Sequence, residues 1–313
     1  MDIAHVPVLL EQTLELLAPK EDGELMVDAT MGEGGHSLAF LSRFPSLRII
    51  GVDADAEVQA VAKERLEEFS GRVEFYRGRA QDFFASYPAG SERPNTALAD
   101  LGISMYHYAK SGRGFSFSAD EPLDMRIDPT VGVSAAELLA GMKEGDIADM
   151  LYQNADERHS RRIARAIARA RGSVAIATSA ALAELVVRAM PAASRRGPIH
   201  PATRTMLALR IAVNEELIGL PNLLEGALRV IKPGGRLGFI SFTSKEDGFV
   251  KRFFKEKSLA CSCPPGMSFC GCGGQSVRLI TRKGVTADEE EKRRNPPSRS
   301  ARLRVAEKIK DVE

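Results

Sequence analysis

Apolar and polar positions follow two different periods in the first hundred residues. Short apolar runs predict strands over residues 25–27, 48–52, 73–76 and 96–101. Between the second and third runs, apolar side chains recur with helical spacing, at Val58, Val61, Ala62, Leu66 and Phe69. Strands that alternate with helices predict a parallel sheet covered by helices, which is an α/β fold.

The alternation stops after Leu101 and returns near Pro221. Helical, Ala- and Arg-rich runs fill the interval, over residues 135–142, 161–171, 179–190 and 202–216. Pro221 is then predicted to open a helix, which a Lys-Pro-Gly-Gly turn and a strand over residues 236–242 follow. This interval is far longer than one strand-to-strand connection needs. We therefore expect a core over residues 1–105 and 216–290, an inserted helical domain over residues 106–215, and a basic C-terminal tail over residues 291–313.

Composition narrows the class of protein. The chain has 313 residues, of which 44% are hydrophobic and 27% charged, which is typical of globular proteins and excludes disorder and collagen. No window approaches the roughly 18 uncharged apolar residues of a membrane span. The first residues carry no basic stretch of a secretory signal, so we expect a cytoplasmic protein that does not act at a membrane.

Basic charge is concentrated in one part of the chain. Residues 158–210 contain eleven Arg, no Lys and one acid, Glu184, a formal net charge of +10. Such a field favours a polyanionic partner, and the planar guanidinium matches phosphate oxygens better than an ammonium does. We expect Arg161, Arg162, Arg165 and Arg169 to form one helical face towards the phosphates of such a partner. The alternatives are a solvated helix face or a clamp against acids of the α/β domain. The tail over residues 292–302 is expected to be a flexible arm or a further nucleic-acid contact.

A glycine-rich segment, residues 28–36, follows the first predicted strand and precedes a helix. Its glycines allow a sharp turn and close approach of the backbone to a ligand. Asp53 ends the second strand, where a carboxylate accepts hydrogen bonds from ribose hydroxyls. This combination predicts an adenosine-containing cofactor, and the alternative is a simple tight turn. A nicotinamide dehydrogenase stays open as a competing class, although its fingerprint would place a third glycine where this chain has Ser37.

The pairing of Gly34-Gly35 with the Pro233-Gly234-Gly235 turn resembles class I methyltransferases, which use S-adenosylmethionine. More specifically, the chain resembles the RsmH (MraW) family of methyltransferases over nearly its whole length and in the family's order. The segments that carry the resemblance are HVPVLL (5–10), GGHS (34–37), DLGIS (100–104), RGFSF (113–117), PLDMR (122–126), RRIARAI (161–167), IHPATRT (199–205), LRIAVN (209–214) and SRSARLRVAE (298–307).

The resemblance implies a Rossmann-like class I fold and an enzyme that methylates the N4 amino group of a cytidine in the decoding region of 16S ribosomal RNA. It also implies that the inserted helical domain recognises the substrate, in the small ribosomal subunit. A non-catalytic RNA-binding assembly factor that retains the fold is the alternative. The oligomeric state is left open.

The resemblance also implies a set of cofactor contacts, which are Gly34, Gly35, His36, Asp53 and Asp100, with Ala80 and His107 at two further positions. Contact by His36 is expected through its backbone. At three positions the chain departs from the family, which often has Phe for Ala80, Gln for His107 and His for Thr243. Ala80 can therefore contact adenine only through its backbone or methyl group, a ring nitrogen of His107 can replace an amide donor, and Thr243 is given no catalytic role.

Methylation of a cytosine amino group needs a hydrogen-bond acceptor, because the nitrogen lone pair is delocalised into the ring. A carboxylate at the end of the fourth strand, beside the cofactor crevice, is placed for this. We therefore predict Asp100 as the catalytic residue. A turn-capping role for Asp100 is the alternative, and Asp124 is the second candidate. The Asn295-Pro296-Pro297-Ser298 run looks like the motif of DNA amino-methyltransferases but lacks its aromatic residue.

A base in structured RNA must be splayed out to reach such a crevice. Aromatic residues are scarce, at 6% with no Trp. The plausible stacking platform consists of Tyr106, Tyr108, Phe115 and Phe117, and a small core cluster is the alternative.

All cysteine lies in one Cys-x-Cys-x6-Cys-x-Cys run, at Cys261, Cys263, Cys270 and Cys272. Four thiolates fit a tetrahedral zinc site. The Cys-x-Cys spacing is tighter than the usual Cys-x2-Cys, and cytosolic thiols stay reduced without a metal. We therefore assign no metal ligand.

Overall fold

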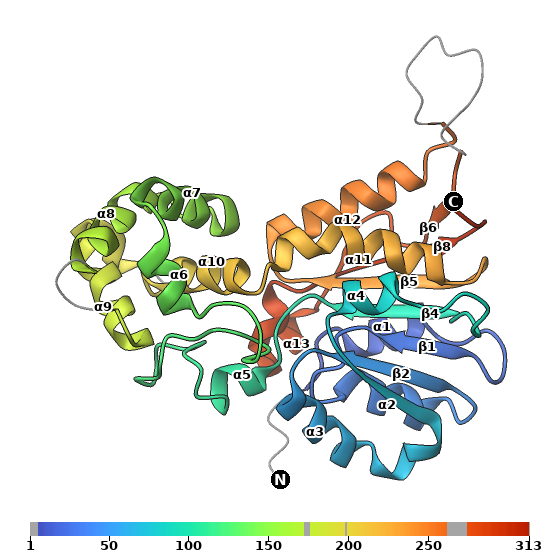
Figure 1. Cartoon of the computed structure of the whole chain (residues 1–313). Coiled ribbons are helices and arrows are strands. Elements are labelled where there is room, and N and C mark those ends of the chain that lie inside the picture. Colours follow the sequence, from blue (N-terminus) through green and yellow to red (C-terminus); the bar gives the residue numbers. More distant parts are fainter. Residues whose placement is uncertain (1–5, 172–175, 198, 262–273, 313) are drawn as a thin grey trace. The chain divides into compact units, whose positions relative to one another are not determined.

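The computed structural model describes residues 6–171, 176–197, 199–261 and 274–312. The chain divides into two compact units (Figure 1). The first comprises Met1–Ser104 and Gly219–Glu313, and the second comprises Met105–Ile218. The second unit is therefore inserted between two parts of the first. No helix within the described ranges is long and apolar enough to span a membrane.

One sheet organises the first unit. Five parallel strands lie in the order β3-β2-β1-β4-β5. They are β1 (Leu25–Asp28), β2 (Arg48–Asp53), β3 (Val73–Arg77), β4 (Thr96–Asp100) and β5 (Arg236–Ser241). The antiparallel β8 (Arg302–Lys308) lies between β5 and β6 (Val277–Leu279), and the short β7 (Val285–Thr286) also pairs with β8. The predicted strands and the mostly parallel sheet are confirmed.

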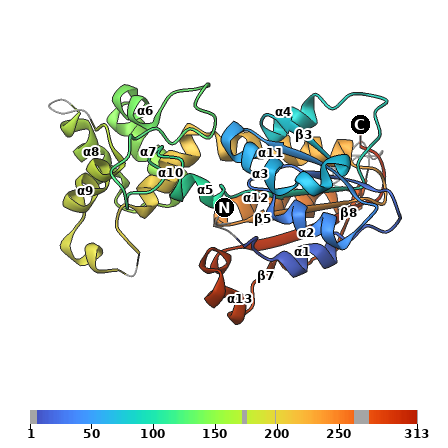
Figure 2. The ribbon, with the colours of Figure 1, turned by 90° about the horizontal axis from the view of Figure 1, so that it is seen from below.

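Helices cover both faces of this sheet (Figures 1 and 2). One face packs against α4 (Ala80–Ala85), α11 (Glu216–Val230) and α12 (Ser244–Lys257), through a core that includes Phe84, Leu224 and Phe239. The other packs against α1 (Leu10–Leu16), α2 (Gly35–Arg43) and α3 (Ala56–Arg65), with Phe40 and Leu66 among the buried residues. Burial on both faces explains why the parallel strands read as apolar runs in the sequence.

Helices build the second unit. They are α5 (Met105–Ala109), α6 (Ala135–Gly141), α7 (Glu144–Ala155), α8 (Ser160–Ala170), α9 (Ser179–Ala189) and α10 (Thr203–Val213). Helix α7 packs against α8 and α10, and α8 packs against α9. Ile163 and Ile167, one turn apart on α8, are fully buried, whereas the arginines of α8 are exposed. In the described part of this unit, β pairing is limited to one isolated bridge between Pro122 and Thr178.

Two expectations from the sequence are wrong. Helix α11 begins at Glu216, so Pro221 lies inside it rather than at its start. Such a proline removes one backbone hydrogen bond of the early helix, which the packed face of α11 outweighs.

The C-terminal residues are not a flexible arm. They form α13 (Glu289–Arg294), a 3-10 turn (Pro296–Arg299) and β8. Their basic residues have partners within the fold. Arg304 forms an ion pair with Asp247 of α12 at 2.7 Å, and the fully buried Lys308 Nζ donates to the Ile231 carbonyl at 2.8 Å. The alternation of Leu303 and Val305 with these basic residues is the strand pattern that the charge obscured.

Candidate active site

Three carboxyl groups end three adjacent strands at one edge of the sheet. Asp28 is the last residue of β1, Asp53 of β2 and Asp100 of β4. The strand order reverses between β1 and β4, because β2 and β3 lie on one side of β1 whereas β4 and β5 lie on the other. Ligands of open α/β sheets bind at the carboxyl ends of the strands beside such a switch point. The structure therefore brings together Asp53 and Asp100, both predicted from the sequence, with Asp28, which was not.

Asp53 ties the glycine-rich segment to the end of β2. Its Oδ2 accepts the backbone N–H of Gly32 at 2.8 Å, and its Oδ1 accepts that of Asp55 at 2.9 Å. The Asp53 carbonyl in turn accepts the N–H of Gly78, so the loop before α4 lies beside it. Each carboxylate oxygen has a second lone pair. Asp53 is half-buried and can still accept hydrogen bonds from ribose hydroxyls.

The glycine segment leads into the N-terminus of α2. Gly34, the N-cap, has a φ of 76°, a left-handed conformation that L side chains rarely adopt. At Gly35 a Cβ atom would lie 2.6 Å from Pro7 Cγ, so no larger residue fits. The N–H groups of the first turn, which include those of Gly35 and His36, have no partner within the helix and attract an anion. A carboxylate, such as that of an amino acid, fits this end.

The His36 side chain does not face a ligand at this loop. It is buried, and its Nε2 lies 3.1 Å from the carbonyl oxygen of Val8. The imidazole thus packs against the N-terminal segment, and a cofactor contact through the backbone of His36 stays a prediction.

Asp28 is buried, and Asp100 is half-buried at the neighbouring strand end. Burial raises the pKa of Asp28 to about 6, although Ser37 Oγ donates to its Oδ2 at 2.6 Å and lowers the pKa. Burial likewise raises the pKa of Asp100 to about 7, and the charges of Asp28 and Glu246 add to the effect. Thr30 Oγ1 accepts the Asp100 N–H at 2.6 Å and so ties β4 to the glycine segment. Such a pair favours a cationic ligand, whose charge stabilises the ionised carboxylates.

Residues of the neighbouring loops complete this edge. Ser104 Oγ donates to Glu33 Oε2 at 3.3 Å, which links the loop after β4 to the glycine segment. Thr243 is the N-cap of α12, where its side chain accepts the N–H of Glu246 in a capping box. This gives Thr243 a structural part, as its residue type suggested.

Ala80 is the first residue of α4, and its methyl group is buried in the core with Phe83 and Phe84. Only the backbone of Ala80 is therefore available for the predicted contact with adenine, and this contact stays a prediction. The nearby Tyr76, which the sequence did not single out, is 38% exposed and has its ring edge-on to Phe83 at 5.1 Å between centroids.

The remaining candidates lie in the helical unit. His107 is buried with its ring 5.1 Å from that of Phe115, which makes Phe115 part of a small core cluster. A contact between His107 and a cofactor stays a prediction. Asp124 is held by two hydrogen bonds from Arg126 at 2.8 Å. Burial alone would raise the pKa of Asp124, but these bonds bring it below its ordinary value.

Phe117 has a different environment from Phe115. Its ring stacks on that of His200 at 4.4 Å between centroids, with 29° between their planes. Both rings line a pocket of about 360 Å³ with Glu184, Val187 and Arg188 of α9. A flat pair of rings beside a carboxylate and a guanidinium is suited to a nucleobase.

The eleven arginines of residues 158–210 divide into three groups. Four pair with acids of the same unit, namely Arg161 with Asp149, Arg165 with Glu144, Arg188 with Glu184 and Arg210 with Glu216. Four donate to carbonyl groups at helix C-termini, which are Arg162 and Arg195 at α9, Arg171 at α6 and Arg204 at α7. Within the described ranges, the exposed Arg158, Arg169 and Arg196 form no hydrogen bond or ion pair.

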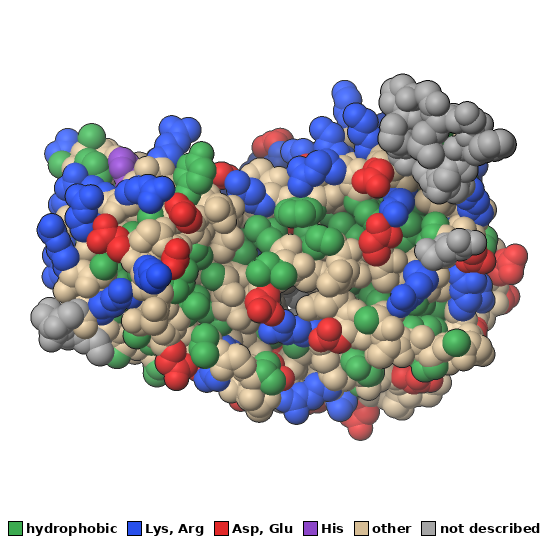
Figure 3. All heavy atoms as spheres, turned by 45° about the horizontal axis from the view of Figure 1, so that its top comes forward, with side chains coloured by type: hydrophobic (Ala, Val, Ile, Leu, Met, Phe, Trp, Pro, Cys, Tyr) green, Lys and Arg blue, Asp and Glu red, His purple; other side chains and the backbone are tan. Residues whose placement is uncertain are grey.

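The structure gives three arginines of the row expected on α8 partners within the unit, and a contact of this row with RNA stays a prediction. Arg161 and Arg165 face acids of α7, and Arg162 caps α9, because guanidinium groups also satisfy the unpaired carbonyls of helix ends. The pairs of Arg161 and Arg165 are exposed and contribute little to stability. Figure 3 shows Lys and Arg side chains over the helical unit with acids among them.

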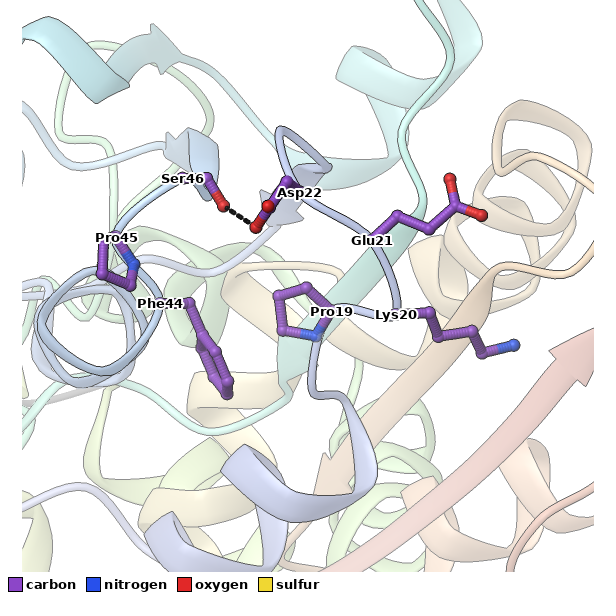
Figure 4. Close-up of a pocket in the computed structure, with 7 residues that line it drawn as sticks. All are labelled: Pro19, Lys20, Glu21, Asp22, Phe44, Pro45 and Ser46. Carbon is purple, nitrogen blue, oxygen red and sulfur yellow. Dashed lines mark hydrogen bonds between the residues drawn. The ribbon is translucent and has the colours of Figure 1, made fainter.

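A further hollow lies away from this edge (Figure 4). Residues 19–22 and 44–46 line a space of about 500 Å³ that includes Phe44, and Ser46 Oγ donates to Asp22 within it. These residues precede β1 and β2, so the hollow is at the amino ends of the strands, opposite the carboxylates. Of the cysteines, Cys263, Cys270 and Cys272 lie outside the described residues. The described ranges contain no cluster of His, Cys, Asp and Glu that could hold a metal ion.

Two features define a class I methyltransferase that uses S-adenosylmethionine. The first is the strand order, with one antiparallel strand beside β5, and the second is the switch point, which is lined by acidic residues and glycines. The carboxylates suit its sulfonium and ammonium charges, and the N-terminus of α2 suits its carboxylate. The MraW methylase family model matches residues 2–309, and the chain belongs to that family.

Known relatives cover the whole chain. It is 52% identical to the ribosomal RNA small subunit methyltransferase H of Treponema denticola, over 99% of this chain and 98% of that protein. It is 42% identical to the protein of that name from Heliobacterium mobile, over 99% and 100% of the two chains. Among solved structures, a putative rRNA-methylase from Clostridium thermocellum has a TM-score of 0.44 at 12% identity, over 97% and 100%.

Proposed function

We propose that this enzyme methylates the N4 amino group of a cytidine in the decoding region of 16S ribosomal RNA, within the small ribosomal subunit in the cytoplasm. The names of its relatives, at up to 52% identity over the full length, support a small-subunit ribosomal RNA substrate. The position of Asp100 carries the choice of an amino group. It is a half-buried acceptor at the end of β4, at the edge of the sheet that is proposed to bind the methyl donor.

Asp100 activates the amino nitrogen as a hydrogen-bond acceptor. S-adenosylmethionine would supply the methyl group from its sulfonium, so that the N–CH3 bond forms as the S–CH3 bond breaks and S-adenosylhomocysteine leaves. When the Asp100 carboxylate accepts a hydrogen bond from one N–H group, the amino nitrogen becomes more tetrahedral. Its lone pair is then less delocalised into the ring. The ionised Asp100 carboxylate can also take the proton that the nitrogen loses on methylation. Thr30 Oγ1 accepts the backbone N–H of Asp100 at 2.6 Å, and the backbone N–H of Gly102 donates to Asp100 Oδ1 at 3.3 Å.

The residue types favour nitrogen over ring carbon. Methylation of the cytosine C5 atom needs a nucleophile, typically a thiol, that adds to the ring first. The groups that end β1, β2 and β4 are carboxylates, which accept hydrogen bonds from an amino group instead. Asp124, which Arg126 keeps ionised, is the second candidate acceptor.

The helical unit is proposed to bind the RNA. Arg158, Arg169 and Arg196 are free to contact phosphates, because no other group in the described ranges occupies their guanidinium groups. The Phe117–His200 pair offers a stacking surface for a splayed base. The helical unit thus combines arginines for the RNA phosphates with a stacking surface for a base.

Transfer of labelled methyl groups tests this function. Purified protein is incubated with labelled S-adenosylmethionine and small ribosomal subunits from cells that lack the enzyme, with large subunits as control. We expect label in 16S RNA, and its loss in Asp100→Asn even at saturating S-adenosylmethionine, with cofactor affinity measured alongside. RNA binding without label transfer would instead support the assembly-factor alternative. Asp124→Asn in parallel shows which carboxylate is the acceptor.

A further inference from the structure

We infer that Glu291 and Asn295, near the C-terminus, are positioning residues for the cofactor, because they hold an N-terminal strap against the glycine segment. The strap is defined as Val6–Leu9. The inference rests on the proposed binding of S-adenosylmethionine at the glycine segment. Glu291 and Asn295 themselves are not proposed to contact the cofactor or RNA.

The strap is packed directly on the start of α2. Pro7 is buried, and its Cγ lies where a side chain at Gly35 would begin, 2.6 Å from the position of a Cβ. The next residue, Val8, offers its carbonyl oxygen to His36 Nε2 at 3.1 Å. Two consecutive strap residues thus fix the first two residues of α2, whose N–H groups are the proposed anion site.

The C-terminal residues hold the strap from its other side. Glu291 Oε1, from α13, accepts the N–H of Leu9 at 2.7 Å. The buried Asn295 donates from Nδ2 to the Val6 carbonyl oxygen at 2.9 Å. The Asn295-Pro296-Pro297-Ser298 run therefore has a use other than catalysis, since its first residue fastens the strap.

Leu9 shows that the strap needs to be held. Its φ is 52°, a left-handed conformation that is costly for a residue with a side chain, and it is fully buried. Such strain persists only where surrounding contacts enforce it. Glu291 holds the N–H of Leu9, and Thr13 Oγ1 donates to its carbonyl oxygen at 2.7 Å.

Helix α3 supports the opposite side of the glycine segment. Leu66 Cδ1 lies 3.1 Å from a Cβ position at Gly34, and Arg65 Nη1 donates to the Glu33 carbonyl oxygen at 3.4 Å. The segment is therefore confined between α3 and the strap. Without a fixed strap only one of these supports remains, and the N–H groups of Gly35 and His36 then no longer keep a fixed direction.

This arrangement predicts which part of the cofactor is affected. S-adenosylhomocysteine carries the amino-acid carboxylate, which the N-terminus of α2 binds. Methylthioadenosine contains the adenosine part alone, which Asp53 binds without help from the strap. A role in positioning weakens binding of the first compound selectively, whereas a merely structural role lowers the melting temperature and treats both compounds alike.

The experiment measures the affinities of both compounds by calorimetry, and the melting temperature, for Glu291→Ala and Asn295→Ala. The matched control is Glu290→Ala, an exposed neighbour on α13 whose only ion pair in the described ranges is with Arg294, at 4.0 Å. Glu291→Gln retains an acceptor oxygen for the Leu9 N–H and tests for rescue. If either alanine variant does not fold, the other and the Gln variant decide the question.

We expect S-adenosylhomocysteine affinity to fall about three- to tenfold in each alanine variant, as for the removal of one hydrogen bond. Methylthioadenosine affinity should stay unchanged, and Glu290→Ala and Glu291→Gln should match the wild type. Unchanged S-adenosylhomocysteine affinity, or an equal decrease for both compounds, would overturn the inference. Because no RNA is used, this result is independent of the outcome for the proposed RNA substrate.

Discussion

The negative charge of Asp28 adds to burial in raising the pKa of Asp100 to about 7. The two residues end β1 and β4, which are adjacent parallel strands. A cation bound beside them stabilises their ionised forms and lowers both pKa values. Cofactor binding and proton release are therefore linked in this site.

The first prediction concerns the pH dependence of cofactor binding. Below the raised pKa values of about 6 and 7, Asp28 and Asp100 are protonated and attract a cation less. Affinity for S-adenosylmethionine should therefore increase as the pH rises from 5.5 to 8, by at most about tenfold per pH unit for each proton released. S-adenosylhomocysteine, which lacks the sulfonium charge, should show a weaker dependence. Calorimetry across this range checks both, and identical pH profiles for the two compounds would contradict the pairing of sulfonium with carboxylate.

A second prediction concerns stability without ligand. A carboxyl group with a raised pKa in the folded state costs stability above its unfolded pKa near 4, and the cost grows until about pH 7. Asp100→Asn should therefore raise the free energy of unfolding at pH 8, by at most about 4 kcal/mol for a shift of about three pKa units. The gain should vanish near pH 4, where both side chains are neutral. Denaturant titrations at the two pH values measure this difference. If Asp100→Asn is less stable than the wild type at pH 8, the folded state does not raise the pKa of Asp100 as described.

A third prediction concerns Asp53. Asp53→Ala removes the acceptor for the ribose hydroxyls and the tie to the Gly32 N–H. Cofactor affinity should fall by about 1 to 3 kcal/mol. The matched control is Asp22→Ala at the amino end of the sheet, which should bind like the wild type. An Asp53→Ala variant that is folded and binds normally would place the ribose elsewhere.

A fourth prediction separates the two uses of arginine. Replacing Arg158, Arg169 and Arg196 by Gln should lower the slope of log RNA affinity against log salt by roughly 0.7 to 0.9 for each phosphate that the variant no longer binds. Arg171→Gln removes a donor to the carbonyls that end α6 and should lower the melting temperature with the salt slope unchanged. If the triple variant keeps the full salt slope, the RNA phosphates do not contact these three arginines.

The sequence predicts the parallel part of the sheet most clearly at β1, β4 and β5, which are buried on both faces and read as apolar runs. It does not predict β6 or β7, which are only three and two residues long, or β8, in which Arg302 and Arg304 interrupt the apolar pattern. Position at a strand end suffices to find Asp53 and Asp100. Asp28 has the same position at the end of β1 and could have been found by the same rule.

Contacts of long polar side chains lie beyond such rules. An arginine that caps a helix and one that is free for phosphate have the same residue type and similar spacing, as Arg162 and Arg169 show. Only the packing of α8 against α7 and α9 distinguishes them. The same holds for His36, whose imidazole turns to Val8 in a segment 28 residues earlier in the chain.

The central claim is that Asp100 directs a methyl group to a cytidine amino nitrogen in 16S RNA. The most direct measurement is mass analysis of nucleosides from 16S RNA after reaction of small subunits with S-adenosylmethionine that carries a deuterated methyl group. The account predicts deuterated N4-methylcytidine with the wild type and little or none with Asp100→Asn. Deuterium in 5-methylcytidine, in a ribose methyl group or in another base would contradict it.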